Sequence, residues 1–204
     1  MHPGSKYFKN FFQNKKILIT GNTGFKGSWM SFVLKEMNAK VFGFSKDIPT
    51  TPSNFKCLNL DKHMKTYYGD VSDFNYFNRI INKVKPDIIF HLAAQSIVFK
   101  SYEEPFQTVR TNSLGVVNLL EILKKYKKKM YCVIITSDKC YLPNKKTFFA
   151  EDDKLGGEDL YSASKAAAEI FIKAYNESFF KFNKNINLCS ARAGNVIGGG
   201  DWSK

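Results

Sequence analysis

Short apolar runs alternate with longer amphipathic segments along the chain. Six runs predict strands, at about 17–20, 40–44, 65–69, 87–91, 131–136 and 186–191. Apolar residues at helical spacing predict helices after the first strand and at about 73–84, 105–126 and 162–182. Strands that are apolar on both faces are typical of a parallel sheet covered by helices. With right-handed crossovers, we expect an α/β fold with one doubly wound parallel sheet in the order 3-2-1-4-5-6.

The first predicted strand runs into a glycine turn, TGNTGFKGSW. Gly21 permits the tight turn, Gly24 lets the backbone approach a pyrophosphate, and Gly27 allows the next helix to pack closely. That helix presents its positive N-terminus to the phosphate oxygens. A glycine triplet alone also fits a flexible loop, but here a strand precedes it and a helix follows it. We therefore predict that a dinucleotide binds at this turn.

Tyr161 and Lys165 stand four residues apart at the start of the last predicted helix. Side chains at this spacing have Cβ atoms about 5–6 Å apart, so the Lys165 ammonium can favour the phenolate of Tyr161. A free tyrosine titrates near ~10, so its pKa must fall by about 3 to give a base at neutral pH. We expect Lys165, a nicotinamide ring and the helix N-terminus to lower it. The pair is typical of enzymes that oxidise a hydroxyl, although YxxxK also occurs by chance.

Ligands of such sheets bind beyond the carboxyl ends of the strands. The glycine turn and residues 91–95, 137–139 and 192–202 all follow predicted strands. We expect one cleft to collect them.

Composition and charge narrow the class of protein. The 204 residues are 44% hydrophobic, and no apolar stretch approaches the ~20 residues that span a membrane. The four cysteines lack CxxC spacing and no secretory leader precedes the first strand, so we expect reduced thiols and a cytoplasmic location. The three histidines are scattered, which predicts no metal site. The net charge of +13 comes from lysines spread along the chain, so we predict no nucleic-acid partner.

Six segments together resemble the extended short-chain dehydrogenase/reductase superfamily, and most closely its CDP-glucose 4,6-dehydratases. They are TGNTGFKGSW, HLAAQS, TNSLGVVNLLE, ITSDKCY, YSASKAAAE and ARAGNVIGGGDW. Related dTDP-glucose dehydratases usually carry Thr-Asp-Glu where this chain has Ser137-Asp138-Lys139, and a different loop at 192–202. This difference favours the CDP-sugar branch.

The resemblance implies an NAD-dependent lyase that converts CDP-glucose to CDP-4-keto-6-deoxyglucose, in deoxysugar biosynthesis for lipopolysaccharide O-antigen. Tyr161 would take the proton of the 4-hydroxyl that Ser137 holds, while hydride passes from C4 to NAD. Lys165 would hold the cofactor ribose. Elimination of water across C5 and C6 is assigned to Asp138 as acid and Lys139 as base, before hydride returns to C6. Asp138 could instead cap a loop, and Lys139 could polarise the keto oxygen as a cation.

The same resemblance assigns binding residues. For the cofactor they are Gly21, Thr23, Gly24, Phe25, Lys26, Gly27, Ser45, Asp47, Asp70, Val71, Leu92, Ala93, Ala94, Tyr161 and Lys165, and for the substrate Gln95, Asn112, Ser137 and Asn195. A strand-end cap and helix packing are the alternatives for Gln95 and Asn112. Asp47 would bind the ribose of NAD, whereas Lys46 would suit the phosphate of NADP, and the resemblance favours NAD. Asp70 would contact the adenine, or with Ser72 cap the next helix.

Members of the superfamily continue into a smaller substrate domain. We therefore expect residues 1–204 to be the dinucleotide-binding Rossmann domain of a longer homo-oligomeric enzyme, with the substrate domain largely missing. The alternatives are a catalytically idle NAD-binding module and another epimerase or dehydratase of the superfamily.

Overall fold

The computed structural model describes residues 3–144 and 148–202. Within them, six strands form one parallel sheet in the order β3-β2-β1-β4-β5-β6, which confirms the predicted order. The strands are β1 (Lys16–Thr20), β2 (Lys40–Ser45), β3 (Lys65–Tyr68), β4 (Ile88–His91), β5 (Met130–Ile135) and β6 (Ile186–Ala191). Each lies within about two residues of the apolar run that predicted it.

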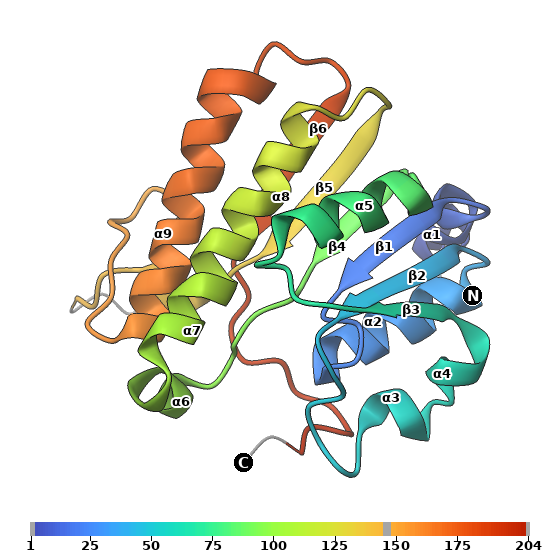
Figure 1. Ribbon diagram of the computed structural model, residues 1–204, viewed down its shortest axis with the longest axis horizontal. Helices are drawn as coiled ribbons and strands as arrows, with labels where there is room; N and C mark the ends of the chain where they lie inside the picture. The colour runs from blue at the N-terminus through green and yellow to red at the C-terminus, as the bar shows by residue number, and fades with distance from the viewer. Residues whose placement is uncertain (1–2, 145–147, 203–204) are drawn as a thin grey trace.

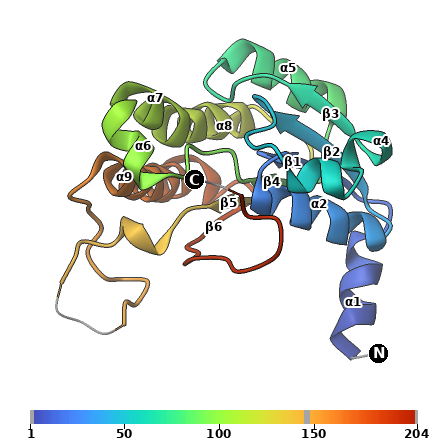
Figure 2. The same cartoon turned by 90° about the horizontal axis from the view of Figure 1, so that it is seen from below.

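Helices cover both faces of the sheet (Figures 1 and 2). Helices α5 (Phe74–Val84), α8 (Gly115–Lys124) and α9 (Leu160–Tyr175) pack on one face, and α2 (Phe25–Glu36) packs on the other. Successive residues of β1 serve the two cores: Leu18 joins the core under α5, α8 and α9, while Ile17 and Ile19 join the core under α2. The central strands β1 and β4 are buried on both faces and are mostly apolar, whereas the edge strands β3 and β6 are partly exposed and carry polar residues.

The long helices begin where the sequence supplies caps. Asp73 accepts a hydrogen bond from Tyr76 N (3.0 Å) at the start of α5, and Asp159 accepts one from Ser162 N (2.9 Å) at the start of α9. The segment predicted as one helix at 105–126 consists of α7 (Pro105–Val109), a π-helical turn (Arg110–Leu114) and α8 in succession. A second π-helical turn (Asn176–Phe180) follows α9.

Other elements had no clear periodic signal. They are α1 (Pro3–Phe12), α3 (Asn54–Cys57), α4 (Leu60–His63), α6 (Val98–Glu103) and a 3-10 turn (Asp138–Cys140). Most are too short for apolar spacing to reveal them. No helix in the described part of the chain is long and apolar enough to cross a membrane.

Candidate active site

A cleft of about 1150 Å³ lies at the carboxyl ends of the strands. Its walls come from the glycine turn, from residues 45–54 and 69–71 after β2 and β3, from residues 92–98 after β4, and from the 193–202 loop. Ser137, Lys139 and Tyr161 also line it. The four segments that we expected to meet at strand ends therefore share one cleft.

The three glycines of the turn have different surroundings. Gly21 has a φ of +71°, and a Cβ there would lie 2.8 Å from Ala93 N. A Cβ on Gly27 would lie 2.1 Å from the carbonyl oxygen of Gly21, so α2 packs directly on the turn. Gly24 has an ordinary φ of −73°, and its added Cβ would meet only the Gly21 oxygen, at 3.4 Å. Gly24 is thus the glycine that leaves space on the cleft side.

The start of α2 suits an anion. Gly24 is the N-cap residue and supplies no side-chain hydrogen bond to the first backbone N–H groups of the helix. Residues 24–27 line the cleft, so these donors and the positive end of the helix lie at its floor. A dinucleotide pyrophosphate fits this cradle, which a side chain at Gly24 would fill.

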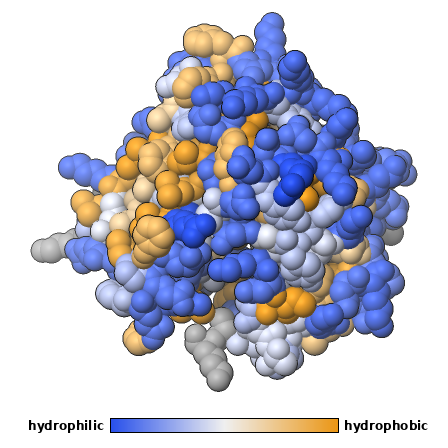
Figure 3. Space-filling model, viewed as in Figure 1, coloured by the Kyte–Doolittle hydropathy of each residue, from blue (hydrophilic) through white to orange (hydrophobic). Residues whose placement is uncertain are grey.

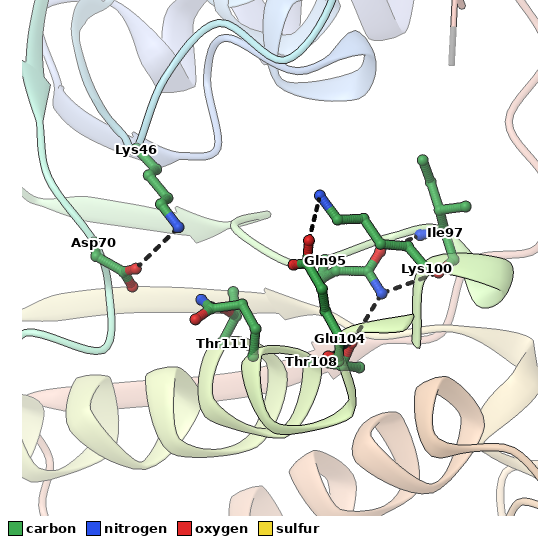
Figure 4. A network of polar contacts seen from close by, with 9 residues as sticks. Lys46, Asp70, Gln95, Ile97, Lys100, Glu104, Thr108 and Thr111 are labelled. Carbon is green, nitrogen blue, oxygen red and sulfur yellow. Dashed lines mark hydrogen bonds and ion pairs between the residues drawn. The ribbon is translucent and has the colours of Figure 1, made fainter. Parts of the chain in front are cut away.

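Two charged residues face each other further along the cleft (Figure 4). Lys46 Nζ lies 3.8 Å from Asp70 Oδ2, and Ser72 N donates to Asp70 Oδ1 at 2.9 Å. Burial acts to raise the pKa of Asp70, but the Ser72 hydrogen bonds and the Lys46 charge bring it below its ordinary value. Asp70 therefore both lines the cleft and caps the following turn. Lys46 and Asp47 both line the cleft.

Gln95 and Asn112 hold the wall together (Figure 4 shows Gln95). Gln95 Nε2 donates to Ile97 O (2.9 Å) and Thr108 Oγ1 (3.0 Å), and Gln95 Oε1 accepts from Ile97 N (2.6 Å). Asn112 Oδ1 accepts from Gln95 N (2.8 Å), while its Nδ2 donates to Gln95 O and Ser164 Oγ, both at 3.0 Å. Asn112 is 2% exposed and does not line the cleft. Its amide joins the 92–98 wall to α9, which agrees with the packing alternative.

Tyr161 and Ser137 lie on the same wall and are both buried. Burial raises the pKa of Tyr161; a hydrogen bond with Ser137 lowers it, and Asp138 and Asp159 raise it, so the net pKa lies above the ordinary value. We expected Lys165, a nicotinamide ring and the helix N-terminus together to lower it. Without the cofactor the net effect of the protein groups is a raised pKa.

The Lys165 ammonium donates to the carbonyl oxygen of Ile135 at 3.4 Å. Burial and, to a smaller extent, the Lys26 charge lower the pKa of Lys165, Cys140 and Glu169 oppose them, and the net pKa is about 8. Burial likewise lowers the pKa of Lys26, against the charges of Asp138 and Asp201. The Lys26 side chain therefore lies among the predicted catalytic residues, a placement that its position in the glycine turn did not reveal.

Asp138 and Lys139 form an exposed turn after β5. Ser137 Oγ donates to Asp138 Oδ1 (3.0 Å), and Asp138 N donates to Ala193 O (3.1 Å). Lys139 lines the cleft, whereas the exposed Asp138 and the buried Lys165 are not part of its lining. The turn is thus placed beside both Tyr161 and the 193–202 loop.

The remaining predicted residues take their places in the lining or behind it. Those that line the cleft are Thr23, Phe25, Ser45, Val71, Leu92, Ala93, Ala94 and Asn195. Sequence reasoning missed Pro49, Thr50, Thr51 and Asn54, since a loop with prolines carries no ligand signal. In the 193–202 loop, which runs on the α2 side of the sheet (Figure 2), Gly199 O accepts from Trp29 Nε1 at 2.9 Å. Among residues 3–144 and 148–202, no three acidic, histidine or cysteine side chains gather to hold a metal.

Comparison with known proteins adds to this geometry. The family model described as GDP-mannose 4,6 dehydratase matches residues 18–198. A CDP-glucose 4,6-dehydratase of Salmonella typhimurium is 46% identical over 96% of this chain and 56% of its own length. A dTDP-D-glucose 4,6-dehydratase of Dictyostelium discoideum is 32% identical, over 90% of this chain and 44% of its own length. The chain thus spans about half the length of these relatives.

Solved structures show the same fold. The UDP-glucose 4-epimerase of Thermotoga maritima with UDP-glucose superposes with a TM-score of 0.77 at 27% identity, over 89% of this chain and 56% of that one. The Thermus thermophilus UDP-glucose 4-epimerase complex with NAD gives 0.71 at 26% identity, over 86% of this chain and 54% of that one.

Proposed function

This chain belongs to the GDP-mannose 4,6 dehydratase family, and on that premise we propose that it is the dinucleotide-binding domain of a CDP-glucose 4,6-dehydratase. The observation that carries the proposal is the 46% identity with the Salmonella CDP-glucose enzyme, against 32% with the Dictyostelium dTDP-glucose enzyme. The Ser137-Asp138-Lys139 sequence supports the same branch. The product is CDP-4-keto-6-deoxyglucose, a precursor for the deoxysugars of lipopolysaccharide O-antigen.

NAD is the proposed cofactor. Its pyrophosphate would rest on Gly24 and the start of α2, its ribose would face Asp47, and its adenine would face Asp70 and Val71. Support comes from the open space at Gly24 and from the Thermus thermophilus epimerase, whose solved complex contains NAD. The chemistry that bound NAD supplies is reversible acceptance of a hydride, taken from C4 and returned to C6.

The first chemical step belongs to Tyr161. Its phenol would take the proton of the 4-hydroxyl, with Ser137 Oγ holding that oxygen. Since the surrounding protein raises the pKa of Tyr161, the phenolate needs nearby positive charge. Lys165 supplies it below about pH 8, where its ammonium is protonated.

We assign the elimination step to two residues of the exposed turn after β5, Asp138 and Lys139. The 4-keto group makes the C5 proton acidic, and Lys139, which lines the cleft, would remove it as a base or polarise the keto oxygen as a cation. Asp138, beside Ser137, would protonate the leaving 6-hydroxyl. The proton given to that oxygen and the proton taken from C5 balance, so one water leaves.

The test is conversion of CDP-glucose by the whole protein with NAD. We expect a product that has lost one water by mass spectrometry, at a higher kcat/KM than with dTDP-glucose or UDP-glucose. A product of unchanged mass with inverted C4 would instead identify a 4-epimerase, the activity named for several structural neighbours. If dTDP-glucose is the better substrate, the CDP-sugar assignment is wrong.

We further propose that the whole protein is a homo-oligomer. Exposed large apolar side chains gather over the α7–α9 side of the molecule (Figure 3), among them Leu114, Ile170 and Phe171. A second copy would cover them, which light scattering can test. The proposed location is the cytoplasm, in keeping with four free cysteines, and the proposal gives nucleic acid no role.

A further inference from the structure

Glu169 is a buried carboxylate that the proposed reaction does not use. It lies on α9 one turn after Lys165 and is 4% exposed. Its Oε2 accepts from Arg192 Nη2 (2.9 Å) and from Ser190 Oγ (3.0 Å), and its Oε1 accepts from the Thr136 hydroxyl. One carboxylate therefore joins α9 to the ends of β5 and β6.

Arg192 extends this connection to the next layer of chain. Its Nη1 donates to the Tyr141 hydroxyl (3.0 Å) and to the carbonyl oxygen of Glu151 (2.8 Å). The Tyr141 ring stacks on Phe149, with centroids 4.7 Å apart and planes at 2°. Arg192 thus fixes the segment that leaves the 138–140 turn.

The Glu169–Arg192 ion pair connects the segment that carries Ser137 and Asp138 with the helix that carries Lys165. Thr136 directly precedes Ser137 and Asp138, and Glu169 stands one helical turn from Lys165. Neither Glu169 nor Arg192 lines the cleft, and the carboxylate oxygens of Glu169 and both Nη atoms of Arg192 bond to protein groups. Their contacts act on the segments that carry Ser137 and Lys165.

We propose that Glu169 and Arg192 are positioning residues, which act through Lys165 and through the segment that carries Ser137 and Asp138. The catalytic consequence rests on the proposed function. The effect on Lys165 does not, and it can be measured without substrate.

The charges around Lys165 indicate that Glu169 is the member of the pair that affects the pKa of Lys165. The titratable groups that interact with Lys165 are Lys26, His91, Cys140 and Glu169. Burial lowers the pKa of His91 to about 3 and raises that of Cys140 to about 11, so both are neutral near pH 7. The Lys26 charge lowers the pKa of Lys165, and Glu169 is the carboxylate among these four groups. Glu169 therefore acts to raise the pKa of Lys165, against the larger effects of burial and Lys26. Arg192, paired with Glu169 at 2.9 Å, is a further charge on this side.

The first test is an NMR titration of the Lys165 side chain, labelled at ¹³Cε, in residues 1–204. The signal is assigned with Lys165→Arg. Glu169→Gln keeps the shape and removes the charge, so the midpoint should fall below the native value of about 8. The matched control is Glu121→Gln, since the Glu121 carboxylate accepts from Tyr175 near the far end of α9 (2.7 Å) and should leave the midpoint unchanged. An unchanged midpoint in Glu169→Gln would overturn the electrostatic role.

The second test uses the whole protein and CDP-glucose. Because misplacement of catalytic groups by about 1 Å can cost on the order of a hundredfold, we expect Glu169→Gln to lower kcat by roughly ten- to a hundredfold with little change in KM. The alkaline limb of the pH profile should move to lower pH. Glu121→Gln should match the native enzyme in both. Equal kcat and pH profiles in the two variants would overturn the catalytic role.

Arg192→Lys tests the geometric role of the pair separately from its charge. It is also the variant to use if Glu169→Gln does not fold. It keeps a cation beside Glu169 but loses the Nη1 contacts to the Tyr141 hydroxyl and to Glu151 O, so kcat should fall while the Lys165 midpoint stays near about 8. Native kcat in this variant would refute the geometric part. If the native protein converts no CDP-glucose, the proposed function fails, and the titration still decides the effect of Glu169 on Lys165.

Discussion

Replacing Gly24 with valine should separate cofactor binding from folding. The backbone there has a φ of −73° and a ψ of 171°, which any residue adopts, and the nearest atom to an added Cβ is Gly21 O at 3.4 Å. The fold should tolerate the change, since losing a glycine reduces the entropy of the unfolded chain by about 0.4–1 kcal/mol. The side chain would occupy the space meant for the pyrophosphate. Losing one hydrogen bond to a charged group costs roughly 1.5–3 kcal/mol, or about 10- to 150-fold in Kd.

Gly27→Ala is the matched comparison variant, and it should lower the stability of the fold. Its Cβ would lie 2.1 Å from the backbone oxygen of Gly21, which no side-chain rotation relieves. Such overpacking costs about 1–3 kcal/mol. For a domain of this size each kcal/mol lowers Tm by roughly 2–4 °C.

Calorimetric titration with NAD and thermal melts of residues 1–204 measure both effects. Gly24→Val should keep the native Tm and lose affinity, whereas Gly27→Ala should melt earlier. Native NAD affinity in Gly24→Val would refute the placement of the pyrophosphate. A native Tm in Gly27→Ala would refute the packing of α2 on the turn.

Four further predictions follow. Lys139→Ala in the whole protein should slow exchange of the C5 hydrogen with solvent yet leave C4 oxidation detectable; equal loss of both would mean that Lys139 positions substrate or maintains structure. Lys26→Met should raise the Lys165 midpoint above about 8 in the NMR titration, and no change would contradict the influence of Lys26. Asn112→Ala breaks three hydrogen bonds outside the cleft, so it should lower Tm while the folded protein keeps its NAD affinity; weaker binding at native Tm would place Asn112 in the site. Residues 1–204 alone should bind NAD but convert CDP-glucose far more slowly than the whole protein, because the chain spans 56% of the Salmonella relative; equal rates would show that this part suffices.

The sheet and the place of the cleft could be predicted from the sequence. Apolar runs identified the strands, most clearly the central ones that are buried on both faces, and right-handed crossovers together with the glycine turn predicted the observed order. Ligand segments follow strand ends, which parallel strands bring to one edge. The spacing of Gly21, Gly24 and Gly27 already distinguished the turn, the open position and the packing contact. Apolar runs and glycine spacing are local or periodic properties of the chain. Residues close together in the sequence are therefore enough to reveal them.

Only the tertiary structure decided which polar groups act on one another. The π-helical turn at 110–114 leaves no mark in the apolar spacing, yet it lies where Asn112 bonds to the 92–98 wall and to α9. The raised pKa of Tyr161 depends on burial, which neighbours distant in sequence create. Lys26 acts on Lys165 from α2, and Arg192, beyond the end of β6, pairs with Glu169 on α9. Such couplings depend on distance and desolvation in three dimensions, and neither quantity is contained in the spacing of residues along the chain.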